Sequence, residues 1–265
     1  MLDFFKKKRK KVGLALGGGA ARGFAHLGVL KGLVDNNIPI DNIVGVSAGS
    51  IVGSLFAAGI PIDDLIEASK KLTWRDFAGI HFSRQGMFSS KPISKLIEKF
   101  IGQMTFKELK IPFSALATKL LEGEGVALCD SDMLVSEAVR ASASFPGIFA
   151  PTIIDDTYYI DGGACANVPA EFVRAMGADV VIAVDVIPHM KLDRVPRHLA
   201  TIVDRGLDLL LHNVTLQSKI SADVFLKPIQ EPMHSLNVNK SKRLIELGIM
   251  EVNRKLSEIK GFLES

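Results

Sequence analysis

The sequence predicts an α/β fold in which helices cover both faces of a mostly parallel sheet. Short apolar runs of strand length alternate along the chain with longer, periodic segments of helix length. Hydrophobic residues make up 48% of the 265 residues and charged residues 23%, which provides enough apolar side chains for a full core. We therefore expect a basic tail over residues 1–11 and a single three-layer α/β/α sandwich over residues 12–265.

The first part of the chain contains two successive units of strand, turn and helix. Residues 12–16 form an apolar run that stops at three glycines, and residues 24–34 repeat apolar side chains at helical spacing. Residues 43–46 are the next apolar run. The small side chains of residues 48–59 predict a helix that packs closely on a sheet. Crossovers of this kind join parallel strands.

The rest of the chain supplies further strands and three helices. The expected elements are a hairpin of residues 111–117 and 126–129, strands at residues 158–160 and 180–184, and helices at residues 131–142, 199–220 and 242–263. Residues 74–90 are the least regular stretch and mix glycine and polar residues with aromatic side chains. They are either a mobile apolar lid or an ordinary packed connection, and we favour the connection because most long loops gate nothing.

The positive charge of the chain belongs to its tail. The first twelve residues carry a net charge of +5, which leaves −2 for the rest of a chain whose total is +3. General affinity for nucleic acid is therefore not predicted. Apolar residues precede the cations, which suits the surface of an anionic membrane, and a solvated terminus is the equal alternative. The cations are Lys6, Lys7, Lys8, Arg9, Lys10 and Lys11.

Several other classes of protein are excluded. Glycines and Arg22 interrupt residues 12–25, so this stretch makes a poor secretory signal. Residues 42–62 contain no charged residue but divide into a short strand and a small-residue helix rather than a membrane span. Cys129 and Cys165 supply neither a disulfide framework nor the spacing of metal ligands. We expect a cytoplasmic protein, at most peripheral at the inner membrane surface, with no metal or cofactor.

The main chemical signal is the pentapeptide GVSAG at residues 45–49. A serine between two glycines after a strand occupies a strained turn into a helix, and the turn exposes its hydroxyl. Ser47 is therefore the predicted nucleophile. The turn also places the Ala48 amide at a helix N-terminus, where it can donate to a developing oxyanion. Such pentapeptides also occur by chance, so the neighbouring motifs decide how this one is interpreted.

A glycine-rich loop and an aspartate provide that context. Residues 17–23 read GGGAARG, and the absence of side chains lets backbone amides approach a negative atom closely. No register of this loop matches the dinucleotide fingerprint, and no Gly-Lys-Ser/Thr follows it as in a Walker loop. A serine nucleophile also needs a base. Asp161 is the best placed candidate, because it follows a strand and two glycines free it to face a neighbouring loop.

The order of these motifs resembles that of the patatin-like phospholipases. GGGxxRG, GxSxGS and DGG follow one another, and residues 141–151 are similar to the segment that leads to the aspartate in bacterial members. The resemblance extends from about residue 12 to residue 185. It implies a patatin-like sandwich and the hydrolysis of phospholipids, lysophospholipids or other fatty acyl esters.

The resemblance also implies roles for particular residues. Asp161 would accept the Ser47 proton directly, without an intervening histidine. The loop amides of Gly18 and Gly19 would form the oxyanion hole, with Ala48 as a third donor. These roles describe a Ser-Asp dyad that works through an acyl-enzyme.

Arg22 matches the basic position of the family. Its guanidinium would either hold the loop or bind a substrate phosphate. We favour these roles over a surface salt bridge, because the fork of an arginine suits a phosphate group.

Three other functions stay open. A Ser-His-Asp esterase of the α/β-hydrolase type would use the same pentapeptide with a late histidine, for which His189 is the best candidate, although the dyad explains more of the motifs. His26 is interpreted as a packing residue. A membrane-recruited module would keep the motifs only to hold a lipid, with little turnover. A nucleotide-binding protein would rest on the glycine loop alone.

Overall fold

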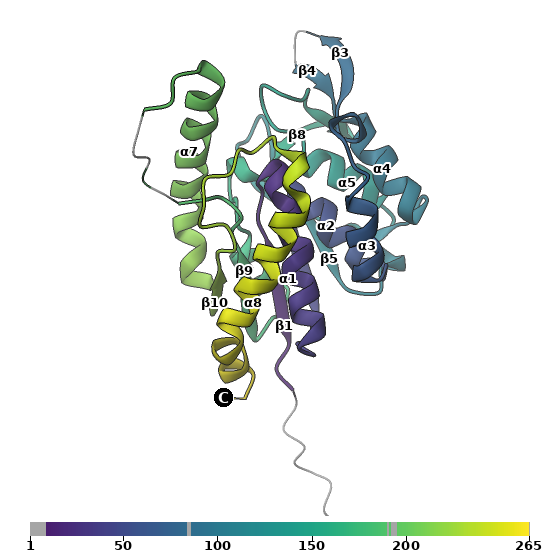
Figure 1. Cartoon of the computed structure of the whole chain (residues 1–265). Helices are drawn as coiled ribbons and strands as arrows, with labels where there is room; N and C mark the ends of the chain where they lie inside the picture. Colours follow the sequence, from purple (N-terminus) through teal and green to yellow (C-terminus); the bar gives the residue numbers. More distant parts are fainter. Residues whose placement is uncertain (1–8, 84–85, 190, 192–194, 265) are drawn as a thin grey trace, which may run out of the picture.

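A central sheet of eight strands passes through the molecule (Figure 1). The computed structural model describes residues 9–83, 86–189, 191 and 195–264. The strand order is β10-β9-β1-β2-β5-β8-β7, and β6 also pairs with β5. The strands are β1 (Val12–Leu16), β2 (Asn42–Val46), β5 (Phe113–Lys119), β6 (Gly125–Leu128), β7 (Thr152–Ile154), β8 (Thr157–Asp161), β9 (Val180–Val184) and β10 (Val224–Leu226).

The pairing confirms the mostly parallel sheet that the sequence predicts. Strands β10, β9, β1, β2 and β5 are mutually parallel, while β6 and β8 run antiparallel to β5. Strand β7 pairs antiparallel with β8. The expected hairpin of residues 111–117 and 126–129 is the β5–β6 pair.

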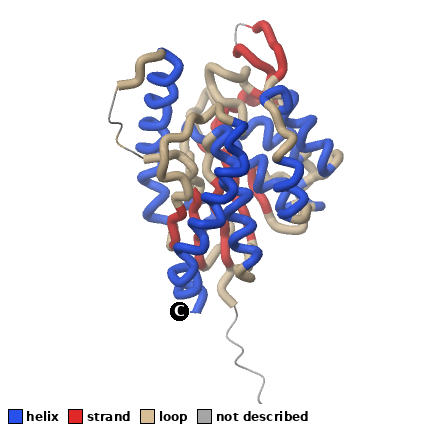
Figure 2. The backbone as a smooth tube through the Cα atoms, in the orientation of Figure 1, coloured by secondary structure: helices blue, strands red, loops and turns tan. Residues whose placement is uncertain are grey.

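Helices lie on both faces of the sheet, as Figure 2 shows. One face is covered by α1, α2 and α8, whose apolar side chains join the larger core cluster, and the other face is covered by α6, against which α7 packs. The helices are α1 (Phe24–Asp35), α2 (Ala48–Ala57), α3 (Ile62–Ser69), α4 (Lys91–Ile101), α5 (Val135–Ser142), α6 (Ala170–Ala175), α7 (Leu199–Ser221) and α8 (Ser241–Glu264).

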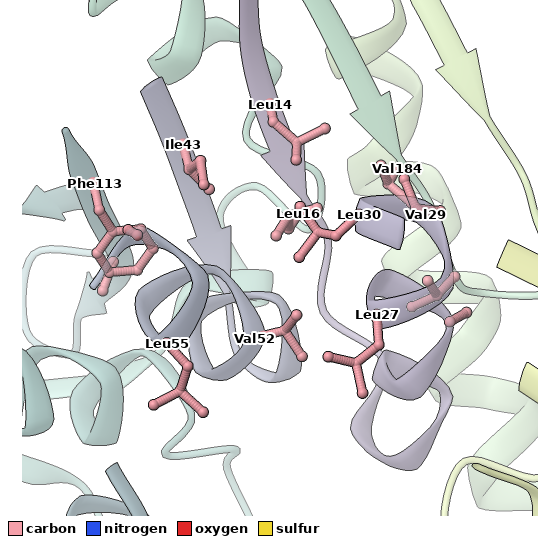
Figure 3. Packing of buried hydrophobic residues seen from close by; sticks show 14 of the residues in the cluster. Leu14, Leu16, Leu27, Val29, Leu30, Ile43, Val52, Leu55, Phe113 and Val184 are labelled. Atoms are coloured by element: carbon pink, nitrogen blue, oxygen red, sulfur yellow. The ribbon is translucent and has the colours of Figure 1, made fainter. Parts of the chain in front are cut away.

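Alternation along the strands builds the two cores. Leu14 and Leu16 of β1 point to the face covered by α1 and α2, where Figure 3 places them beside Ile43. Successive side chains of a strand point to opposite faces of the sheet. Ala15 of β1 and Val44 of β2 therefore face the second cluster, which α6 covers. Because both faces are buried, these strands are apolar apart from Asn42 at the start of β2.

Several elements differ from those that the sequence predicts. Helix α5 begins at Val135 rather than Ser131, because Leu134 has an extended backbone. Residues 74–90 contain a short 3-10 turn (Trp74–Asp76) and the strands β3 (Gly79–Ser83) and β4 (Gly86–Ser89), which form a separate hairpin. Helices α3, α4 and α6 and strands β3, β4, β7 and β10 are not among the elements that the sequence predicts.

The membrane predictions have separate outcomes. Residues 42–62 divide into β2 and α2, as expected, and end at the first residue of α3. Within the described ranges, none of the helices combines the length and apolar character that a bilayer span needs. Of the basic tail, Lys6, Lys7 and Lys8 lie outside the described residues, while Arg9 forms a two-pronged ion pair with Asp41.

Candidate active site

The register of the sheet brings Ser47 and Asp161 to the same level. Val46, the last residue of β2, pairs with Leu116 of β5, and Asp161, the last residue of β8, pairs with Ala117 of β5. Strand β6 pairs with the same two residues of β5 from one side, so β2 and β8 lie end to end along the other side. The chain therefore leaves the sheet at Ser47 and at Asp161 where the ends of β2 and β8 face each other. Both residues line the same cavity.

Ser47 occupies the strained turn that the pentapeptide predicts. Its backbone has φ 52° and ψ −120°, a left-handed region that a non-glycine residue adopts only where its surroundings impose it. A Cβ on Gly49 would lie 2.2 Å from the Leu16 carbonyl oxygen, so only glycine fits beside the first strand. Helix α2 begins at the next residue and directs its amides toward the turn.

Ser142 holds this turn from behind. The Ser47 amide donates to Ser142 Oγ at 3.0 Å, and Ser142 Oγ donates to the Leu116 carbonyl at 2.6 Å. Ser142 is fully buried. The relay satisfies a backbone donor that the strained geometry would otherwise leave unpaired, and it links the turn to β5.

Asp161 is a buried carboxyl with one anchored oxygen and one unpartnered oxygen. The Gly163 amide donates to Oδ1 at 2.8 Å, whereas Oδ2 has no hydrogen-bond partner among the described residues. Burial raises the pKa of Asp161 to about 6, and the nearby Ser47 hydroxyl and the Gly163 amide oppose that rise. The carboxylate is thus ionised at neutral pH but retains affinity for a proton.

The glycine loop places one of its two predicted amides where it can meet an oxyanion. The Gly18 amide donates to the Asn167 carbonyl at 3.1 Å, so in this arrangement it already has an acceptor. Within the described part of the chain, the amides of Gly19 and Ala48 have no acceptor. Gly19 and Ala48, which both line the cavity, are the donors that remain.

Arg22 lies in a buried ion pair. Its Nη1 and Nη2 contact the two carboxylate oxygens of Asp208 at 2.6 and 3.0 Å, and its Nε donates to the Met233 carbonyl at 3.0 Å. Only 1% of the residue is exposed. The guanidinium of Arg22 already pairs with Asp208, and this ion pair is buried rather than on the surface. These contacts agree with a role in holding the glycine loop.

The two histidines considered in the sequence lie in different settings. His26 is buried and its ring contacts the Gly17 carbonyl at 2.7 Å, and burial lowers its pKa to about 4, so the neutral ring donates there. His189 pairs with Asp185 at 2.5 Å and packs against the ring of His212. His189 is not among the residues that line the cavity with Ser47.

The cavity itself is apolar, with a volume of about 190 Å³. Helices α2, α3 and α4 and the turn before β3 contribute part of its walls. The side chains include Leu55, Leu65, Leu72, Phe77, Leu96 and Phe100. Ser47 and Asp161 lie at one side of a space whose chemistry suits an acyl chain.

Three residues that support the site were missed in the sequence. Ser142 holds the nucleophile turn, Asn167 holds Gly18, and Asp208 pairs with Arg22. Asn167 follows Asp161 by six residues, so its place in the same turn offered a weak signal. The other two come from distant parts of the chain. In the described ranges, no group of three His, Cys, Asp or Glu side chains could hold a metal ion.

Comparison with known proteins identifies the family. The model for the patatin-like phospholipase family matches residues 14–174. An NTE family protein of Mycobacterium tuberculosis is 34% identical over 177 residues, which are 66% of this chain and 48% of that protein. The neuropathy target esterase sws of Drosophila melanogaster is 33% identical over 186 residues, 66% of this chain and 13% of that protein. The chain thus spans about half the length of the mycobacterial relative.

Solved structures share the fold at low sequence identity. VipD from Legionella pneumophila has a TM-score of 0.55 and 14% identity, with 96% of this chain and 67% of that chain covered. The type III effector ExoU has a TM-score of 0.56 and 14% identity, with 97% and 54% covered. These likenesses confirm the patatin-like α/β fold. With the family match over residues 14–174, they lead to the conclusion that this chain belongs to the patatin-like phospholipase family.

Proposed function

We propose that the protein hydrolyses lipid acyl esters with Ser47 as nucleophile and Asp161 as its base. The observation that carries this proposal is the unpartnered Oδ2 of a buried carboxyl, whose pKa is raised to about 6, beside the Ser47 hydroxyl. A carboxylate with this pKa can take a proton near neutral pH. In enzymes generally, the hydrogen bond between nucleophile and base is often long without substrate and shortens when substrate binds.

The reaction would proceed in two steps. Ser47 Oγ attacks the acyl carbonyl while its proton passes to Asp161, and the amides of Gly19 and Ala48 stabilise the tetrahedral oxyanion. Collapse of the intermediate expels the alcohol, which takes the proton from Asp161. Water, deprotonated by the same carboxylate, then attacks the acyl-enzyme and releases the fatty acid and Ser47.

The apolar cavity supports a fatty acyl group as the substrate. Its walls of leucine and phenylalanine would bind a hydrocarbon chain by excluding water from it. A relative that is 31% identical over 194 residues is named lysophospholipase nte1 in Aspergillus fumigatus. We therefore propose a phospholipase, lysophospholipase or related carboxylic-ester hydrolase.

Hydrolysis by matched variants tests this proposal. We expect Ser47→Ala and Asp161→Asn each to lower kcat on a medium-chain lysophospholipid by about a thousandfold or more in a folded protein. His189→Ala, which removes the base of a Ser-His-Asp triad, should stay within about threefold of the parent activity. An inactive His189→Ala with an active Asp161→Asn would replace the dyad by the triad. Lipid binding without turnover in the parent protein would indicate a lipid-binding module instead.

A further inference from the structure

Asn167 carries a buried side-chain amide whose nitrogen has no hydrogen-bond acceptor. The residue is 1% exposed, and its Nδ2 finds no partner among the residues that the structure describes. An unpaired buried donor destabilises a fold, so each one that persists needs an explanation, such as a catalytic role. Asn167 also lines the cavity that holds Ser47 and Asp161. Its donor therefore belongs to the space that a substrate oxygen would enter.

The main chain of Asn167 already performs a structural task. Its carbonyl accepts from the Gly18 amide at 3.1 Å, which joins the turn after β8 to the glycine loop. The residues on either side, Ala166 and Val168, are buried in the second core cluster, which α6 covers. The position of Asn167 is thus fixed by its backbone and its neighbours. The hydrogen bond to Gly18 does not involve the side-chain amide, so that amide is available for another role.

The side chain lies between the glycine loop and the candidate base. Asn167 Oδ1 is 2.8 Å from the position that a Cβ on Gly18 would take, and the Ser47 Cβ is 3.3 Å from that same position. A Cβ on Gly163 would likewise lie 3.1 Å from both Asn167 Oδ1 and Asp161 Oδ1. The amide group is therefore a neighbour of the nucleophile and of the base, although its Nδ2 bonds to neither.

The acceptor that suits Nδ2 is the oxygen of the reacting carbonyl rather than the carboxylate of Asp161. The Nδ2 of Asn167 and the Oδ2 of Asp161 are both unpaired, although the two side chains are neighbours. The Ser47 hydroxyl and the Gly163 amide already oppose the rise in the pKa of Asp161, and one more donor would lower that pKa and weaken the base. An oxyanion, by contrast, is stabilised by every donor placed where its charge develops.

The backbone supplies fewer donors to that oxyanion than the motifs predict. The Gly18 amide already has an acceptor, which leaves the amides of Gly19 and Ala48. The acceptor of the Gly18 amide belongs to Asn167, so one residue takes up a backbone donor and brings a side-chain donor to the same place. We propose that the Asn167 side chain is a catalytic residue that donates from Nδ2 to the oxyanion, together with the amides of Gly19 and Ala48.

This inference rests on the proposed function and deepens it. When Ser47 Oγ bonds to the acyl carbon, its proton passes to Asp161 and the electron pair of the carbonyl double bond moves to the oxygen. The Asn167 amide donates a hydrogen bond to that oxygen and keeps its proton, so the step balances through Asp161 alone. Collapse of the intermediate restores the carbonyl. Because attack by Ser47 and attack by water both form an oxyanion, the amide acts in both steps.

Substitution of two buried asparagines tests the inference. The change is Asn167→Ala, and the matched control is Asn42→Ala, which also removes a buried amide with one unpartnered atom but lies outside the cavity. On soluble p-nitrophenyl butyrate at pH 8, we expect Asn167→Ala to lower kcat by about a hundredfold or more, with KM within about threefold. The control should stay within about threefold in both constants. Circular dichroism checks that each variant is folded.

A second variant keeps the shape of the side chain. Asn167→Asp retains Oδ1 and replaces the donor by an oxygen, so it should lose at least as much activity as Asn167→Ala. It carries the same test if the alanine variant does not fold.

Two further measurements distinguish an oxyanion donor from a structural residue. An alkyl trifluoromethyl ketone binds by addition of Ser47 Oγ and then carries an oxyanion, whereas the secondary alcohol of the same chain length does not. Asn167→Ala should weaken binding of the ketone by about fiftyfold or more and that of the alcohol by less than about threefold. The midpoint of the pH profile should stay near 6, the raised pKa of Asp161, because Nδ2 does not bond to that carboxylate.

The contrary results are equally specific. Parent activity in Asn167→Ala, or an equal loss in Asn42→Ala, overturns the inference, as does equal weakening of the ketone and the alcohol. A midpoint that moves by about one pH unit or more would assign the amide to Asp161 instead. Slower deacylation after an unchanged acylation burst would assign it to the hydrolytic water. These results leave the proposed function standing, whereas a parent that neither hydrolyses the ester nor binds the ketone through Ser47 contradicts both.

Discussion

Replacing Asp161 by asparagine should make the protein more stable as well as inactive. Burial raises the pKa of this carboxyl from 3.8 to about 6, so the ionised carboxylate is less stable in the folded state than in the unfolded chain. At about 1.4 kcal/mol for each pH unit, the ionised carboxylate lowers the free energy of unfolding by about 3 kcal/mol above pH 6. An asparagine has nearly the same shape, does not titrate, and retains an oxygen to accept from the Gly163 amide.

The size of this effect depends on pH. Below about pH 4 the carboxyl is protonated in both the folded and unfolded states, so the substitution gains nothing there. Between pH 4 and pH 6 the unfolded chain releases the proton first, and the gap opens as pH rises. Thermal unfolding at pH 4, 6 and 8 should therefore give an Asp161→Asn protein with a Tm about 6 to 12 °C above the parent at pH 8 and little difference at pH 4.

The control for this measurement is Asp156→Asn, which changes an exposed carboxyl and should leave Tm nearly unchanged at every pH. A substituted protein that is less stable than the parent at pH 8 would refute the argument that burial strains the charge. A gain of equal size at all three pH values would refute it as well, because the effect would then not come from ionisation.

Two further predictions concern the same site. The rate of soluble-ester hydrolysis should fall about tenfold for each pH unit below about pH 6, because Asp161 must be deprotonated to accept the Ser47 proton; a flat profile from pH 4 to 8 would contradict this. Ser142→Ala should lower kcat about tenfold and the free energy of unfolding by about 1 to 3 kcal/mol, because it leaves the Ser47 amide unpaired in a strained turn. Ser131→Ala, an exposed change, should alter neither quantity.

Much of the fold could be predicted because local patterns coincide with tertiary constraints. The apolar runs of β1, β2 and β9 are buried on both faces, so no alternation complicates them. Strand β10, by contrast, has only three residues, and helix α6 only six, too short for a periodic pattern to emerge. Elements this short are stable only because the rest of the fold packs against them. A short stretch of sequence carries no information about that packing.

The residues of the candidate site likewise differ in whether local sequence could predict them. Ser47 and Asp161 lie in motifs whose backbone requirements are local, so the sequence alone can nominate them as candidates. The acceptor of the Gly18 amide, the carbonyl of Asn167, could not be predicted, because it reaches the loop only when the turn after β8 folds back over it. Arg22 finds Asp208 across 186 positions of sequence, and no spacing rule connects the two. Long-range polar partners of this kind depend on the completed packing.

Covalent labelling of Ser47 is the most direct test of the proposed dyad. A fluorophosphonate with a long alkyl chain reacts when an activated serine oxygen displaces its fluoride, and peptide mass spectrometry locates the adduct. We expect one adduct on Ser47 at pH 8, none in Ser47→Ala, and labelling at least a hundredfold slower in Asp161→Asn. An unlabelled Ser47 in the folded protein, or labelling that is as fast in Asp161→Asn as in the parent, would contradict the account.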